Sequence, residues 1–285
     1  MLNLERGKRR VIFSGQNSHG SNESWYYRMN LLSQIPKNNK VAVVIECPTI
    51  DLILHLLRMK KNIHHEMDYS FLLSSTYWWM RSIEFASFLR AIPRSFSVYG
   101  IDVPVNLNNY SKYIDSLTSI TFPEKKILLS LMEYDINHNN IMSVISAKDR
   151  EVAMNNKLSL IMEGCYDLIF VVCHNFHASK KSWLNYPSLC QLLRTDSIGN
   201  YSIYSSAVFS KNMSFIATPD GSSLSLNRID NVCSKVTDDN WLTKMVSSLY
   251  RSEEKDVLSL TINTPKHFDE IIIYPKGHAI KVGIV

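Results

Sequence analysis

Four apolar segments of the sequence each end in residues that can do acid–base chemistry. The first runs into a polar loop that carries His19, the second and third end at Glu46 and Asp102, and the fourth ends at His174 and His177. A charged group directly after a buried strand is costly to bury without partners, so its position there indicates a specific role. A neutral imidazole can accept a proton near neutral pH, and a neighbouring carboxylate can fix its tautomer. The residue types therefore suit a site that activates water.

Each of these residues also has a purely structural explanation. A glutamate at a strand end is commonly a cap or an ion-pair partner, and His19, which precedes a helical pattern, could cap that helix. His174 and His177 could be hydrogen-bonded core histidines, because their spacing at a strand end does not ensure that both rings face one point. The convergence of several titratable groups on one edge favours a functional site over these alternatives.

A sheet is needed to bring these strand ends together, and the sequence predicts one. The apolar runs are typical of buried strands, and they alternate with segments of helical periodicity. We expect strands at 11–13, 41–45, 96–101 and 167–173. Helical periodicity covers 23–32, 50–59, 81–91, 123–134 and 149–163. This alternation favours an α/β fold with a largely parallel central sheet flanked by helices, in which ligands bind beyond the carboxyl ends of the strands.

The helix expected at 149–163 has the clearest pattern. Its apolar residues share one face and its polar residues fall elsewhere, with Met154, Leu158, Ile161 and Met162 against Asn155, Lys157 and Ser159. This pattern predicts an amphipathic helix with one apolar face.

The C-terminal third is β-rich, so the sheet is expected to be mixed. Strand-like segments cover 201–209, 213–218, 257–262, 270–274 and 280–284, with turn signals at 220–221 and 276–277. No linker rich in proline, glycine or charge divides the chain. We therefore expect these segments to form the far side of the same sheet plus hairpins, within a single domain that spans residues 1–285.

Composition excludes several classes of protein. The net charge is +5, but the basic residues are scattered, so nucleic-acid binding is not indicated. The five cysteines form no Cys-x-x-Cys pair, which suits a reducing compartment. No apolar run approaches the ~18 residues of a membrane span, and the first ten residues lack the apolar core of a Sec signal peptide.

Six short motifs, in collinear order between about residues 11 and 209, resemble the erythromycin esterase-like family. The matching segments are 15–23 with Arg28, 44–46, 77–89, 99–102, 150–156 and 173–177. Each motif is weak alone, but their shared order is far more specific. The resemblance implies an α/β hydrolase of esters, related to a wider group that includes haem-uptake and Wnt-cleaving proteins.

The resemblance also implies roles for individual residues. His19 would be the general base that activates water, and Glu46 would orient that water or the base. Arg28 would stabilise developing negative charge, and we expect it to pair with Glu46. His174 and His177 would polarise the substrate carbonyl or donate to the leaving group. A guanidinium is a natural permanent cation for such an oxyanion.

One position departs from the family pattern. Gln16 stands where the family has its first glutamate, and an amide can neither take a proton nor supply charge. Either Glu46 carries the acid–base work alone, or the chemistry differs, or catalysis is lost and the site only binds. We assign Gln16, Asp102 and Trp79 to substrate binding. A serine nucleophile is disfavoured, because Gly-x-Ser-x-Gly is absent.

Cofactor and cellular setting follow from the same resemblance. We expect no cofactor, although His19, Glu46, His174 and His177 could together bind zinc or manganese. The chain is shorter than resistance esterases and looks like a plant-pathogen type III effector of the Hop group. That likeness implies secretion into a host cell and an unknown substrate, which could be a host component. A bacterial cytoplasmic enzyme and an inactive scaffold that binds a host component are the alternatives.

Overall fold

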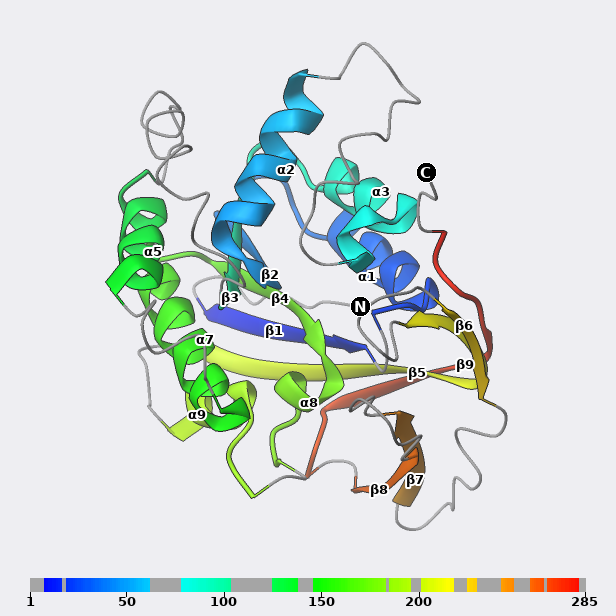
Figure 1. The fold of residues 1–285 in the computed structure, drawn as a ribbon. Coiled ribbons are helices and arrows are strands. Elements are labelled where there is room, and N and C mark those ends of the chain that lie inside the picture. Colours follow the sequence, from blue (N-terminus) through cyan, green and yellow to red (C-terminus); the bar gives the residue numbers. More distant parts are fainter. Residues whose placement is uncertain are drawn as a thin grey trace.

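The chain folds around a central sheet with helices on both faces (Figure 1). The computed structural model describes residues 8–16, 19–61, 78–103, 125–137, 146–182, 185–195, 201–217, 225–229, 242–248, 257–263 and 266–281. The strands of the sheet are β1 (Arg9–Gln16), β2 (Val41–Pro48), β3 (Ser97–Asp102), β4 (Leu168–His174), β5 (Tyr201–Ala217), β6 (Ser225–Ile229) and β9 (Glu270–Gly277).

Parallel pairing dominates this sheet. The described strands follow the order β3-β2-β4-β1-β5-β6, and β9 pairs with β5 off this path. All pairs are parallel except β5 with β6, which are antiparallel. A separate antiparallel pair is formed by β7 (Leu242–Ser248) and β8 (Val257–Asn263). The predicted α/β class, with a largely parallel sheet and a β-rich C-terminal third, is confirmed.

Helices cover the two faces of the sheet in two groups. On one face lie α1 (Glu23–Ser33), α2 (Thr49–Lys61), the 3-10 helix η2 (Trp78–Arg81) and α3 (Ile83–Ala91). On the other lie α5 (Lys125–Asn137), α7 (Ala147–Met162), the short α8 (Asn175–Ala178) and α9 (Leu189–Thr195). Strand side chains alternate between faces, so Val11 and Phe13 belong to one core while Ile12 belongs to the other. The continuous apolar runs thus reflect burial on both faces.

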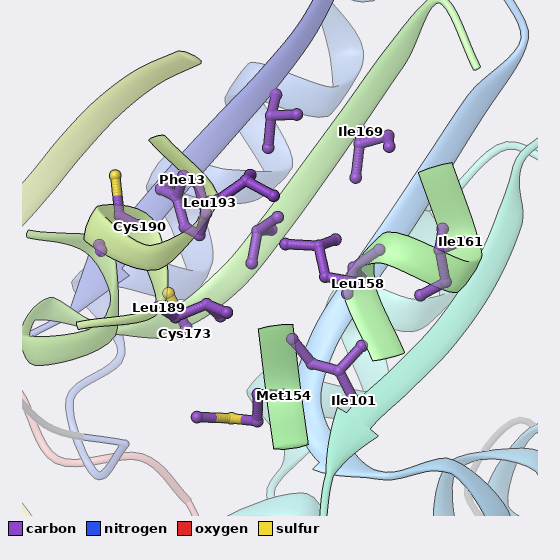
Figure 2. Packing of buried hydrophobic residues seen from close by; sticks show 14 of the residues in the cluster. Phe13, Ile101, Met154, Leu158, Ile161, Ile169, Cys173, Leu189, Cys190 and Leu193 are labelled. Carbon is purple, nitrogen blue, oxygen red and sulfur yellow. The ribbon is translucent and has the colours of Figure 1, made fainter. Parts of the chain in front are cut away.

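The α7 face of the sheet shows how the apolar pattern is used. Met154, Leu158 and Ile161 of α7 lie in the same buried cluster as Ile101 of β3 and Ile169 of β4 (Figure 2). Deleting methylene groups here would cost about 0.8 kcal/mol per buried CH₂. The predicted apolar face of α7 is therefore confirmed.

The structure corrects several expected elements. The segments predicted at 201–209 and 213–218 are one continuous strand, β5. Ile280 and Lys281 are not in a strand, and residues 282–284 of the strand predicted there lie outside the described residues. The helix expected from residue 81 starts at Ile83, because the Ser82 side chain caps it by accepting from Phe85 N. None of the described helices is long and apolar enough to cross a membrane.

Candidate active site

The carboxyl ends of β1, β3 and β4 lie at the same edge of the sheet as Glu46 of β2. Glu46 does not follow its strand but sits within it, at a point where the pairing of β2 with β3 shifts between Ile45 and Pro48. Gly100 faces this irregularity, since a Cβ there would lie 2.5 Å from Cys47 O. The absence of a side chain at Gly100 lets β2 bend across β3, and a bend of this kind re-aims a side chain.

Four nitrogen atoms surround the buried carboxylate of Glu46. Its Oε1 lies 2.7 Å from Arg150 Nη2 and 3.0 Å from His177 Nε2. Its Oε2 accepts from the backbone N of His174 at 2.7 Å and lies 3.7 Å from His19 Nε2. Burial opposes the charge on Glu46, but His177 outweighs it and holds the pKa of this carboxyl well below its usual value. Glu46 is therefore an ionised acceptor.

Arg150 is held in place by a second carboxylate. Asp102, which is buried, accepts from Arg150 Nε and Nη2, both at 2.8 Å. Burial acts against ionisation of Asp102, but Arg150 lowers its pKa. The Arg150 side chain keeps 32% of its surface exposed. Asp102 therefore positions Arg150, which reaches solvent, and the predicted contact of Asp102 with substrate stays a prediction.

His177 lies between two carboxylates. Its Nε2 faces Glu46, and its Nδ1 lies 2.6 Å from Glu151 Oε1. Burial alone would lower the pKa of His177, but Glu151 and Glu46 raise it to about 10. His177 is therefore an imidazolium at neutral pH. The 3.4 Å approach of Arg150 Nη1 to His177 Nε2 accordingly places two donors side by side rather than forming a hydrogen bond.

Stability should depend on this proton. Unfolded His177 loses its proton near its ordinary pKa of 6.5, whereas the folded ring keeps it up to about 10, so unfolding releases a proton in between. The contribution is fully present below about pH 6.5 and is lost as the pH rises through about 10. We expect the difference in unfolding free energy between wild type and His177→Asn, measured with urea, to shrink over this window. A constant difference would contradict the charged state of His177.

His19 is partly exposed, with 22% of its side chain accessible. Its ring stacks on Trp79 at 4.9 Å and 12°, and the ring of His174 lies 6.0 Å away. His174 in turn stacks on Phe176 at 4.9 Å. Trp79 is buried and supports the ring of His19, and its predicted role in substrate binding stays a prediction.

Arg28 does not reach the solvent side of the site. Its side chain is fully buried and donates to the carbonyl oxygens of Ser14 and Cys173 and to Gln16 Oε1. Burial lowers the pKa of Arg28 to about 9. The predicted pairing of Arg28 with Glu46 is replaced by that of Arg150 with Glu46. The predicted role of Arg28 on substrate charge therefore lacks the access that it needs.

The loop that carries His19 is fastened by the C-terminal end of the described chain. Ile280 N donates to Gly20 O, and Asn22 N donates to His278 O, both at 2.9 Å. Glu23 at the start of α1 accepts from the backbone N and Nδ1 of His278. These bonds hold the chain on the α1 side of His19.

The structure thus brings together the five residues that the sequence placed at one edge, His19, Glu46, Asp102, His174 and His177. We call His19, Glu46, Asp102, Arg150, Glu151 and His177 the Glu46 cluster. Their catalytic roles stay predictions. Arg150 and Glu151 were missed as site residues, although their adjacent charges in one of the family-like motifs were the available signal.

A metal ion does not fit the described residues. Both ring nitrogens of His177 face carboxylates, and the Nδ1 of His174 accepts from Phe176 N. Among the described residues, no group of three or more His, Cys, Asp or Glu side chains is arranged to hold a metal.

Comparison with known proteins places the fold. No protein-family model and no curated protein matches the sequence. A succinoglycan biosynthesis protein aligns with a TM-score of 0.67 at 13% identity, covering 97% of this chain and 90% of its own. A Bacillus cereus protein aligns with a TM-score of 0.63 at 15% identity, and the alignment covers 98% of this chain and 91% of that protein. Erythromycin esterase EreC in its open conformation aligns with a TM-score of 0.59 at 16% identity, and the alignment covers 97% of this chain and 92% of that protein. The resemblance to erythromycin esterase is therefore confirmed at the level of the fold.

Proposed function

We propose that this chain is an esterase-like hydrolase that uses the Glu46 cluster to add water to a substrate carbonyl. The observation that carries the proposal is the convergence of His19, His177 and Arg150 on the buried carboxylate of Glu46. The fold shared with erythromycin esterase EreC supports it. The buried carboxylates hold cations next to the partly exposed ring of His19. This arrangement suits proton transfer by His19 beside the negative charge that develops on the substrate oxygen.

In the proposed reaction, His19 takes a proton from water as the water oxygen bonds to the carbonyl carbon. The carbonyl oxygen becomes an oxyanion, which the guanidinium of Arg150 stabilises. Collapse of this intermediate breaks the bond to the alcohol oxygen, which leaves with the proton that His19 returns. The products are an acid and an alcohol. Glu46, kept ionised, holds Arg150 and His177 in place throughout.

The role of Arg150 can be tested directly. We expect Arg150→Ala to lower kcat/KM on a panel of nitrophenyl esters and a macrolide lactone by ~10²–10³-fold, the typical cost of removing one oxyanion donor. Arg150→Lys should recover part of this loss, because it restores the charge but not the bidentate contact with Asp102.

The exposed Arg194 at the end of α9 provides the matched control, and Arg194→Ala should leave kcat/KM unchanged. Melting temperatures separate a loss of chemistry from a loss of folded protein. The proposal fails if Arg150→Ala loses activity only in proportion to its folded fraction.

Binding without hydrolysis is the second candidate, and Gln16 favours it. The amide of Gln16 contacts His19, and an amide offers no charge to the proton transfer. A protein of this kind would bind an ester or a host component and release it unchanged. Mass spectrometry of the ligand after incubation distinguishes the two candidates, since hydrolysis adds one water to its mass.

We also propose that the chain acts inside a host cell as a type III effector. Support comes from its cysteines, since the described Cys47, Cys165, Cys173 and Cys190 are all free thiols, as suits a reducing cytosol. A fusion to a calmodulin-dependent cyclase reporter tests this. Host-cell cyclic AMP should rise only when the bacterial type III apparatus is intact.

A further inference from the structure

The side-chain amide of Gln16 has a single possible orientation. Its Oε1 accepts from Arg28 Nη1 and from Ser24 Oγ at 3.1 Å. A guanidinium has only donors, so the atom of Gln16 that faces Arg28 must be the oxygen. The amide nitrogen therefore faces His19, and it contacts Nδ1 of that ring.

This contact decides where His19 carries its proton. The Nε2 of Gln16 is a donor only, so Nδ1 of His19 must accept with its lone pair. In the neutral ring, the proton then sits on Nε2. The other side of the ring agrees, because Nε2 faces the carboxylate oxygen Glu46 Oε2 at 3.7 Å. A lone pair on Nε2 would lie against that negative charge, whereas an N–H is attracted to it.

We propose that Gln16 is a positioning residue that holds His19 in the tautomer with its proton on Nε2. In this state His19 donates a hydrogen bond at the partly exposed side of the Glu46 cluster, so the ligand atom that it meets is an oxygen acceptor such as a carbonyl. The tautomer that could take a proton from water at Nε2 is the minor one. Gln16 thus slows the hydrolysis proposed above, and only this last step rests on that proposed function.

A glutamate at position 16 would invert the arrangement. One carboxylate oxygen would still accept hydrogen bonds from Arg28 and Ser24. The other oxygen carries no proton, so it could only accept a hydrogen bond, and His19 would have to donate it from a protonated Nδ1. The lone pair of His19 would then lie on Nε2, ready to accept a proton. Arg28, whose hydrogen-bond partners Ser14, Gln16 and Cys173 are all uncharged, would also gain a counter-ion.

The tautomer can be measured by ¹⁵N NMR on the full chain with labelled imidazole rings, at a pH where the ring is neutral. His19→Asn identifies the His19 signals by difference. We expect the wild type to show the proton on Nε2 and Gln16→Glu to show it on Nδ1. Ester hydrolysis in Gln16→Glu should rise at least about tenfold, a fraction of what a positioned general base contributes.

Gln191→Glu on α9 is the matched control. Gln191 accepts from Ser182 N, and its change should alter neither the His19 signals nor the hydrolysis rate. A wild-type His19 with its proton on Nδ1 overturns the inference, whatever the activity, and this measurement does not require any variant of Gln16 to fold. If both proteins, the wild type and Gln16→Glu, show the predicted tautomers but neither hydrolyses esters, the inference about Gln16 is supported and the proposed hydrolase activity is rejected.

Discussion

Replacing His19 with alanine is expected to lower the rate of ester hydrolysis by ~10²-fold in the native sequence, and by up to ~10⁴-fold when Gln16 is also glutamate. The smaller loss is expected natively because Gln16 keeps most of His19 in the tautomer that cannot accept a proton at Nε2. Hydrolysis is measured as kcat/KM on nitrophenyl esters in both backgrounds.

The fold should survive this change. His19 sits in a turn with its ring partly exposed, and its contacts are Trp79, Gln16 and the longer approach to Glu46. Substitutions at such positions usually change stability by about 0.5 kcal/mol. His278→Ala is the histidine control, because this ring is 67% exposed and the backbone N of His278 still donates to Glu23. A strong fall in Tm with a matching fall in activity would make His19 structural.

The second large effect concerns the ion pair between Lys157 and Asp135, whose side chains are both fully buried. Lys157 Nζ lies 2.6 Å from Asp135 Oδ1 and 2.9 Å from the carbonyl oxygen of Asp102. Lys157→Met would remove the cation that faces the buried carboxylate of Asp135. We expect a loss of about 3–5 kcal/mol in unfolding free energy, and hence a Tm lower by roughly 6–20 °C.

Two further variants check the cause of this loss. Lys148→Met removes an exposed lysine from the same helix and should leave Tm almost unchanged. Lys157→Met combined with Asp135→Leu removes both charges and should recover most of the stability, because a buried pair is often replaceable by apolar groups. If the double variant melts as low as Lys157→Met alone, the loss of the ion pair between Lys157 and Asp135 is not the cause.

Local patterns were enough to predict the layers of the fold. The runs around Val43 and Phe170 are apolar without alternation, because helices cover both faces of a parallel sheet, and this signature lies in the sequence itself. The periodicity of α7 likewise marked its buried face. The same periodicity placed Lys157 off the apolar face of α7, yet the structure buries its side chain. Lys157 is buried because it pairs with Asp135 of α5, and no local sequence pattern predicts this contact between the two helices.

The positions of the strand ends also predicted part of the site. His19, Glu46 and His177 follow or belong to neighbouring parallel strands, and parallel strands deliver their carboxyl ends to one edge. This rule did not predict which arginine pairs with Glu46. Arg28 is nearer in sequence to His19, but α1 turns its guanidinium toward buried backbone oxygens of Ser14 and Cys173.

The sequence by itself determined the α/β order and which titratable residues stand at one edge of the sheet, because burial periodicity and strand direction are properties of neighbouring residues. Only the tertiary structure decided which charges meet. Arg150 faces Glu46 because α7 packs across β3, and the proton of His19 sits on Nε2 because Arg28 turns the amide of Gln16. Hydrogen-bond donors and acceptors are matched by distance and direction, and these are set only when elements far apart in the chain pack together.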